Sequence, residues 1–303
     1  ALDVNGSLAI EEDSTLDAQG NAITIAGDWT NNDGTFNANG NTVTFDGDGE
    51  QYITSGGSSF YNLDIANTYV DTVYLQDALD VDGDLTIEED STLDAGENEK
   101  DDSNGYSINI AGNWDNKGEF VHNENTVTFD STSQSDITGN NTFWNLTINT
   151  TDGAKTVRFG ADQTQVIENT LVLTGAAGQV LTIRSTTDGV QAILDIPAPI
   201  DAGVNYVDVQ DNQIANTNSI TPADSMDSGN NTNWLFVGPL DHFVWEAIPT
   251  QTACGAFIVL ITAQDASNNT PTLDANGSAF TNSESVAFTT NTTASPSGQV
   301  PTY

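Results

Sequence analysis

The chain contains the stretch LDVNGSLAIEEDSTLDA from Leu2 to Ala18 and a close copy, LDVDGDLTIEEDSTLDA, from Leu79 to Ala95. The copy begins 77 residues after the original, and the similarity continues downstream with small insertions. AGDW returns as AGNW, NTVTFD returns unchanged, and FYNLDI returns as FWNLTI. Self-similarity at a fixed period is typical of architectures in which repeats stack on one another. The sequence therefore predicts a stacked-repeat protein.

Each repeat is built from short runs in which apolar and polar residues alternate. In the first repeat the runs begin at Leu2, Ala22, Thr42 and Leu63, about 20 residues apart, and Gly, Asn and Asp separate them. Such runs are typical of strands joined by turns. A strand that recurs at this interval can lie in register beside the preceding one, about 4.8 Å further along. We predict an all-β fold whose main part is a parallel β-solenoid of about ten coils, with the 77-residue offset equal to four coils.

The predicted core consists of inward-facing columns that run from coil to coil. Leu2 and Val4 begin the columns, and Val207 and Val209 stand near their end. Large aromatic residues recur in phase with these columns, which favours interior packing over a sugar-binding ladder on the surface. The matched aromatic residues are Trp29 with Trp114, Phe36 with Phe120, and Phe45 with Phe129.

The composition narrows the classes of partner. The chain has 44 Asp and Glu residues against 5 Lys and Arg, which gives a formal net charge of −39 at pH 7. Such a charge repels nucleic acids and anionic membranes. The longest apolar stretch, Ala256 to Ala263, is far shorter than the roughly 18 residues that a membrane span requires. We therefore expect neither nucleic-acid binding nor membrane insertion.

The coil motifs GNW, TVTFD and FxNLTI, closed by YVDVQD and SGNNTNW, resemble the β-helical regions of very large bacterial cell-surface and secreted proteins. The stretch that begins DHFVWEAIPT at Asp241 resembles the opening strands of the Ig-like domains that commonly follow such regions. The resemblance implies an extracellular or cell-surface location and no particular activity. It divides the chain into a solenoid, residues 1–237, and a partial Ig-like β-sandwich module, residues 238–303.

The Ig-like module is expected to be incomplete. Its strands are predicted near His242 to Ile248, Phe257 to Gln264 and Val286 to Thr290. These are fewer than the roughly seven strands of an Ig-like sandwich. Two explanations stay open: the sequence is a piece of a longer chain, or another subunit completes the sheet.

Acidic clusters supply the only candidate metal ligands. Alignment of Leu16 with Phe36 in neighbouring coils places Asp13 beside Asp33. Two carboxylates about 5 Å apart either bind a cation or repel each other. Ca²⁺ is therefore a candidate ligand, although no cofactor is required. A second candidate is the turn that contains Asp46, Asp48 and Glu50.

The second copy is expected to differ at this position. Alignment of Leu93 with Phe120 places Asp90 beside Lys117. A carboxylate and an ammonium group at this distance would neutralise each other. Only the first copy is therefore predicted to hold a cation between neighbouring coils.

The sequence does not indicate an enzyme. The histidines, His122 and His242, belong to different predicted modules, and no nucleophile with a matching base, phosphate-binding loop or zinc-ligand spacing is visible. Some parallel β-helices cleave acidic polysaccharides, but that activity needs carboxylates gathered in one groove and a basic residue nearby. The basic residues are scattered along the chain: Lys100, Lys117, Lys155, Arg158 and Arg184.

An open end of a solenoid exposes strand edges and apolar columns, which favour association. We predict that subunits join head to tail into a homopolymer, as a structural subunit of an extracellular filament or surface layer. The alternative is a cell-surface adhesin or carbohydrate-binding stalk. The predicted interface combines the first coil with the Ig-like strands, through Leu2, Val4, Phe257, Val259, Ile261, Val286 and Phe288.

Overall fold

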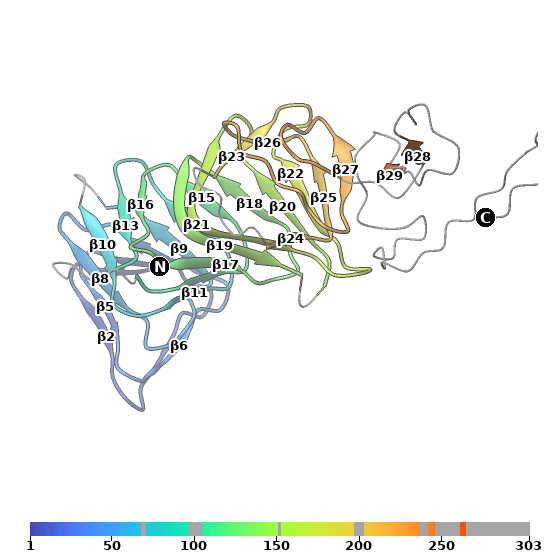
Figure 1. Cartoon of the computed structure of the whole chain (residues 1–303). Coiled ribbons are helices and arrows are strands. Elements are labelled where there is room, and N and C mark those ends of the chain that lie inside the picture. The colour runs from blue at the N-terminus through green and yellow to red at the C-terminus, as the bar shows by residue number, and fades with distance from the viewer. Residues whose placement is uncertain are drawn as a thin grey trace, which may run out of the picture. The chain divides into compact units, whose positions relative to one another are not determined.

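The structure is a computed structural model of the whole chain, and it describes residues 1–67, 71–96, 105–150, 153–196, 203–236, 242–245 and 261–264. It contains two compact units, Ala1–Phe236 and Val237–Tyr303. In the described part of the first unit, every regular element is a strand, and strands of successive coils pair in parallel. The first unit is thus a parallel β-solenoid of about ten turns, as the alternating runs predicted (Figure 1).

Each coil runs over three faces, which we name A, B and C in chain order. Face A is one continuous 11-stranded sheet, because each of its strands pairs with the strand one coil later. In order along the solenoid, it contains β1 (Leu2–Val4), β4 (Ile23–Ile25), β7 (Thr42–Phe45), β9 (Asn62–Ile65), β12 (Leu85–Ile87), β15 (Trp114–Asn116), β18 (Ser135–Thr138), β20 (Lys155–Phe159), β22 (Leu181–Ser185), β25 (Val207–Gln210) and β27 (Met226–Gly229).

Faces B and C are joined by two long strands that turn a corner, β19 (Asn141–Asn149) and β21 (Thr164–Thr174). Their first halves lie on face B and their second halves on face C, with a register shift at the corner between Phe143 and Asn145. The other strands of face B are β2 (Leu8–Ile10), β5 (Trp29–Asn31), β8 (Gln51–Thr54), β10 (Thr72–Leu75), β13 (Thr92–Asp94), β16 (Glu119–Val121), β23 (Ala192–Asp195) and β26 (Asn212–Ile214). Face C also contains β3 (Thr15–Asp17), β6 (Thr35–Asn37), β11 (Leu79–Val81), β14 (Ile108–Ile110), β17 (Thr126–Phe129) and β24 (Gly203–Asn205).

The core is the column structure that the sequence predicted. Ile23 pairs with Leu2 in the preceding coil and with Val43 in the next, and the column continues coil by coil to Phe159. From Ile23 onward these inward residues are almost fully buried. The matched aromatic residues, Trp29 and Trp114 among them, are also interior, which confirms packing over a surface ladder.

The duplicated block does not return to the same face of the solenoid. Leu2–Val4 lies on face A, whereas its copy Leu79–Val81 lies on face C and pairs with Ile108–Ile110. Along face A, Leu63 is three coils and Leu85 four coils beyond Leu2. Leu79 therefore falls two-thirds of the way round the fourth coil.

The prediction that 77 residues equal four coils is thus wrong, because four coils after Leu2 the chain has reached Leu85, 83 residues on. The copy is displaced by three and two-thirds coils, so each of its strands lies one face away from the original. β1, β2 and β3 on faces A, B and C correspond to β11, β12 and β13 on faces C, A and B.

The second unit is described at one pair of strands. β28 (His242–Trp245) and β29 (Ile261–Gln264) pair antiparallel, with Trp245 opposite Ile261. The third predicted strand, near Val286, lies outside the described residues. The Ig-like module therefore stays a prediction.

Candidate assembly surface at the first coil

The first coil presents a free strand edge on each of its three faces. On face A, the Leu2 N–H donates to the Ala22 carbonyl (2.9 Å), and the Ala26 N–H donates to the Val4 carbonyl (3.0 Å). Because peptide groups alternate in direction along a parallel strand, the N–H and C=O of Asp3 point away from the second coil. The same alternation applies to Ala9 on β2, whose neighbours Leu8 and Ile10 bond to the second coil. Within the described residues, no strand pairs with this outer side.

Apolar side chains that are buried in the second copy remain partly exposed in this coil. Leu2 is 42% exposed, whereas its counterpart Leu79 is 1% exposed. Val4, Leu8 and Leu16 are only partly buried. Their counterparts Val81, Leu85 and Leu93 are completely buried. The residue types are the same in the two blocks, but their exposure differs. A preceding coil covers the residues of the second block, whereas no described coil covers those of the first.

The exposed end is also hollow. A cavity of about 410 Å³ opens among Leu2, Leu16, Ala18 and Ile23, with Asp17 and Asn21 at its border. The free energy falls when another chain segment covers apolar side chains of this kind and removes them from water. We call Leu2, Val4, Leu8 and Leu16, together with the free edges of β1, β2 and β3, the first-coil surface.

The last rung of the solenoid has a different character. On face A, Asp227 occupies the register position that Val209 holds one coil earlier. Its carboxylate accepts hydrogen bonds from the Gly229 N–H (2.9 Å) and from the Asn231 side chain (2.6 Å). The column that contains Ile183 and Val209 therefore ends in a solvated carboxylate at the last rung, whereas another column of the same face begins with Leu2 at the first coil.

The structure gives Asp13 and Asp33 a local structural role. Leu16 pairs with Phe36, as predicted, so the two aspartates lie in corners of neighbouring coils. Both have a positive φ, 61° and 60°, a left-handed conformation that Asp adopts more readily than most residues. Both side chains are exposed. The corner geometry accounts for these residues without a ligand.

Asp46, Asp48 and Glu50 lie in another corner, between β7 and β8, and they too are exposed. Glu50 accepts a hydrogen bond from the Tyr52 hydroxyl (3.1 Å). Over the described ranges of the chain, no group of three or more potential metal ligands comes together. Ca²⁺ binding stays a prediction at both candidate sites.

The predicted pair of Asp90 and Lys117 does not form. The Lys117 ammonium group instead lies 3.0 Å from Glu88 and 3.4 Å from Asp115. The corner between β12 and β13 has four residues, whereas the corner one coil later has only Lys117 and Gly118. The shorter corner places Lys117 opposite Glu88, which directly follows β12.

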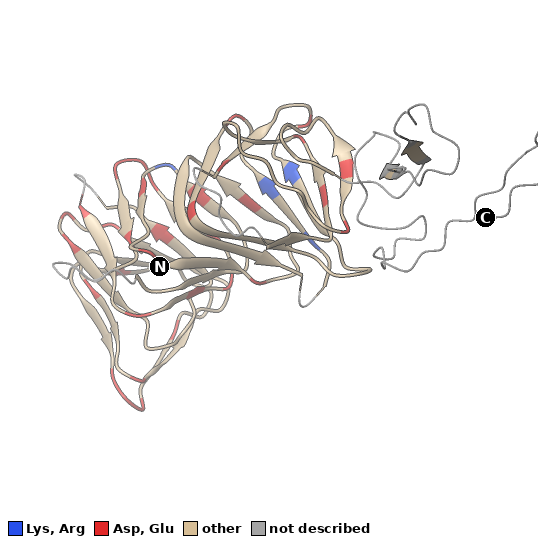
Figure 2. Cartoon of the chain, in the orientation of Figure 1, with Lys and Arg blue, Asp and Glu red and all other residues tan. Residues whose placement is uncertain are grey.

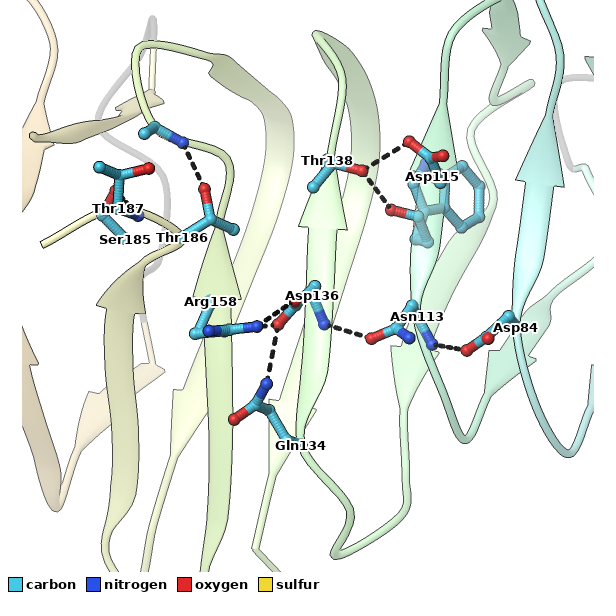
Figure 3. A network of polar contacts seen from close by, with 12 residues as sticks. Asp84, Asn113, Asp115, Gln134, Asp136, Thr138, Arg158, Ser185, Thr186 and Thr187 are labelled. Atoms are coloured by element: carbon cyan, nitrogen blue, oxygen red, sulfur yellow. Dashed lines mark hydrogen bonds and ion pairs between the residues drawn. The ribbon is translucent and has the colours of Figure 1, made fainter.

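Many polar side chains outside the core hold one coil to the next. Asp84 accepts the N–H of Asn113 (2.8 Å), and Asn113 accepts the N–H of Asp136 (2.8 Å), as Figure 3 shows. Asp136 then forms an ion pair with Arg158, whose Nε lies 2.7 Å from it. The first copy has the same ladder of side chain to backbone contacts at Ser7, Asp28 and Tyr52.

One basic residue is buried inside the solenoid. Lys155, 2% exposed, donates from Nζ to the carbonyls of Ser131 and Ser133 and to the hydroxyl of Ser135, each at 2.9 Å. Burial lowers the pKa of Lys155 to about 8. The sequence offered no signal for this arrangement, because the position is polar in both copies and Lys is rarely buried.

Face B carries a second feature outside the core. The rings of Tyr52 and Tyr74 stack with a centroid distance of 5.5 Å and an interplanar angle of 20°. Asp94 occupies the next register position after Tyr74, and burial raises the pKa of its carboxyl group. An open cavity of about 580 Å³ begins there and extends past Thr72, Thr92 and Glu119.

Among the predicted interface residues, the structure describes the side chains of Leu2 and Val4 only. Ile261 is placed by its backbone pairing with Trp245. Phe257, Val259, Val286 and Phe288 lie outside the described residues.

Comparisons with known proteins found no match to this chain, whether with a family model, a curated protein or a solved structure. In the part of the chain that the structure describes, there is no helix long and apolar enough to cross a membrane.

Proposed function

We propose that the protein is a structural subunit of an extracellular filament or surface layer, and that it joins its neighbours through the first-coil surface. The observation that supports the proposal most is the contrast between Leu2 and Leu79. Leu2 is exposed in the first coil, whereas Leu79, at the matching position of the second copy, is buried. Exposed strand edges with apolar side chains promote association, and a contact between unlike surfaces extends into a filament when it does not close.

The two ends of the solenoid constrain how a head-to-tail homopolymer could form. Direct stacking would bring Asp227 of the last rung onto the apolar first coil and remove a carboxylate from water, which is costly. The complementary surface is therefore better sought in the second unit, residues 238–303, as the incomplete Ig-like module suggested. Strand addition to an open sheet edge is an established mode of recognition.

Charge sets the conditions under which such joining is expected. No Lys or Arg precedes Lys100, so the first-coil surface lies in a region without basic residues (Figure 2). Repulsion between like-charged subunits weakens as salt screens it, and Ca²⁺ can bridge carboxylates. We therefore expect association to increase with ionic strength or with added Ca²⁺.

Sedimentation and electron microscopy of the purified full chain test the proposal. We expect concentration-dependent rods that lengthen when salt or Ca²⁺ is added. Leu2→Asp together with Val4→Asp should abolish the rods, while Leu235→Asp, at a residue that is 51% exposed outside the first coil, should leave them intact. A chain that stays monomeric at high concentration with and without Ca²⁺ would rule out self-assembly.

A second candidate function, a carbohydrate-binding stalk or adhesin, is favoured by the stacked Tyr52 and Tyr74 beside the acidic cavity on face B. Aromatic faces and carboxylate acceptors together suit sugar rings. A glycan array with wild-type protein and with Tyr74→Ala tests it. Binding that disappears in the variant would support this function, and no binding to any glycan would eliminate it.

A further inference from the structure

The molecule itself contains a covered version of the first-coil surface. The second block, Leu79–Ala95, has the same inward residues as Leu2–Ala18 and differs from it at three positions. These differences, Asn5 to Asp82, Ser7 to Asp84 and Ala9 to Thr86, lie outside the inward columns. The two blocks therefore present nearly the same surface to whatever precedes them.

The coil that covers the second block runs from Phe60 to Leu75. Phe60 bonds on both sides of Val81: its N–H donates to the Asp80 carbonyl (2.9 Å), and its carbonyl accepts the Asp82 N–H (2.8 Å). On the next two faces, β9 covers β12 and β10 covers β13, both in parallel register. The apolar residues Phe60, Leu63, Ile65, Val73 and Leu75 of this coil are all buried.

We propose that the partner of the first-coil surface is a further repeat unit that ends in a coil of the Phe60–Leu75 kind. This inference goes beyond the proposed function, because it concerns the same surface and names a different partner for it than residues 238–303 of another copy. The one-face displacement between the copies fixes the expected arrangement: the Phe60-like residue lies over β1, the NLDI-like strand over β2 and the TVYL-like strand over β3. The partner strands are parallel to those of the first coil.

The side chains of the Phe60–Leu75 coil match the first-coil surface better than the side chains on the last rung of another copy do. It offers apolar residues at its inward positions, where the last rung offers Asp227. It also supplies a free peptide edge in the parallel direction. Two first-coil surfaces that met through a twofold axis would instead pair antiparallel and would bring two equally acidic ends together.

A chain with one added unit tests the inference. In this chain, Ala1–Ala78 is repeated directly before Leu2 of the full sequence, so that Ala78 precedes Leu2 as it precedes Leu79 in the native chain. We expect hydrogen exchange at the amides of Asn5 and Ala9 in the original first coil, the counterparts of Asp82 and Thr86, to slow by on the order of 100-fold. The matched control repeats only Ala1–Leu75 and so lacks the corner Gln76–Ala78. Without this corner, the strands of the added coil cannot lie in register with those of the original first coil.

Equal exchange at Asn5 and Ala9 in the two fusions would overturn the inference. If the fusions do not fold, a peptide of residues 60–78 added to the unmodified chain provides the second measurement, with Leu63→Asp in the peptide as control. Protection by the native peptide only would support the inference, and no protection by either peptide would refute it.

The unmodified chain separates this inference from the proposed function. If Asn5 and Ala9 become protected as its concentration rises, copies join without a further unit, so the proposed function stands and the inference fails. If the unmodified chain stays monomeric while the fusion is protected, self-assembly fails and the inference stands.

Discussion

The two copies of the repeat have the same local packing at different places in the solenoid. In the first, the Trp29 ring lies 4.7 Å from Phe36 and 5.2 Å from Phe60. In the second, the corresponding distances from Trp114 are 4.8 Å and 5.5 Å. Yet Trp29 lies on face B and Trp114 on face A. The same sequence can form strands on different faces because every face has the same alternation of inward and outward side chains. A copy can therefore begin on any face, provided that its apolar residues still point inward.

The copies also differ in what covers them and in how they satisfy buried polar groups. Among the described residues, no strand pairs with the outer edge of the first coil, whereas the second copy lies between coils on both sides. A buried corner is filled by the neutral Gln51 in the first copy and by Lys155 in the second. These differences predict unequal effects of matched substitutions.

The largest expected difference concerns core leucines at matched positions. Leu85→Ala removes a completely buried side chain and should lower the free energy of unfolding by about 4 kcal/mol. Leu8→Ala, at the partly exposed counterpart, should cost about 1 kcal/mol because much of the side chain already contacts water. Urea unfolding of the two variants measures both values. Equal losses would show that the first coil is covered in solution.

Lys155 should make the second copy sensitive to alkaline pH. Its folded pKa of about 8 lies below the unfolded value of 10.5, so the unfolded chain binds more protons between these values and stability rises with pH. Relative to Lys155→Met, the wild type should gain up to about 3 kcal/mol across this window. Gln51→Met is the matched control in the first copy and should show no such trend. A wild-type advantage over Lys155→Met that stays constant from pH 8 to 10.5 would contradict the assignment.

The buried indole nitrogens distinguish the copies further. Trp114 donates to Asn141 (2.9 Å), whereas Trp29 Nε1 has no hydrogen-bond partner among the described residues. Asn141→Ser should cost about 2 kcal/mol, since it leaves the Trp114 and Asn116 donors unpaired.

The converse change, Ser58→Asn, should stabilise the first copy by about 1 kcal/mol by giving Trp29 an acceptor. Thermal unfolding of the two variants checks both signs. A Ser58→Asn variant that is less stable than the wild type would mean that the first copy has no room for the longer side chain.

The smallest effect is expected at Asp64, where the second copy has Thr147. Burial, and then the nearby Glu88, raise the pKa of the Asp64 carboxyl group. Its contribution to stability is therefore complete at low pH, below the unfolded value of 3.8, and is lost as pH rises through the folded pKa. Asp64→Thr should stabilise the chain by about 0.5 kcal/mol at pH 7 and not at pH 3. A gain that is the same at both pH values would exclude the carboxylate as its cause.

Much of the fold was predictable because it rests on local patterns. The alternation in Ile23–Ile25 and Val43–Phe45 requires strands with one buried side, and the interval between them requires stacked coils. The register of Leu16 with Phe36 followed from the same pattern. The candidate site was predictable only at Leu2 and Val4, where an apolar column meets the first coil.

The sequence by itself determined that this protein is a β-solenoid with inward columns and an internal copy, because a period of two residues within strands is sufficient to separate core from surface. Only the tertiary structure decided on which face each copy lies, where Lys117 finds its partners, and that Lys155 is buried. These outcomes depend on the summed lengths of the corners. One or two residues at a corner barely alter the sequence pattern, yet they determine which side chains stand opposite each other in neighbouring coils.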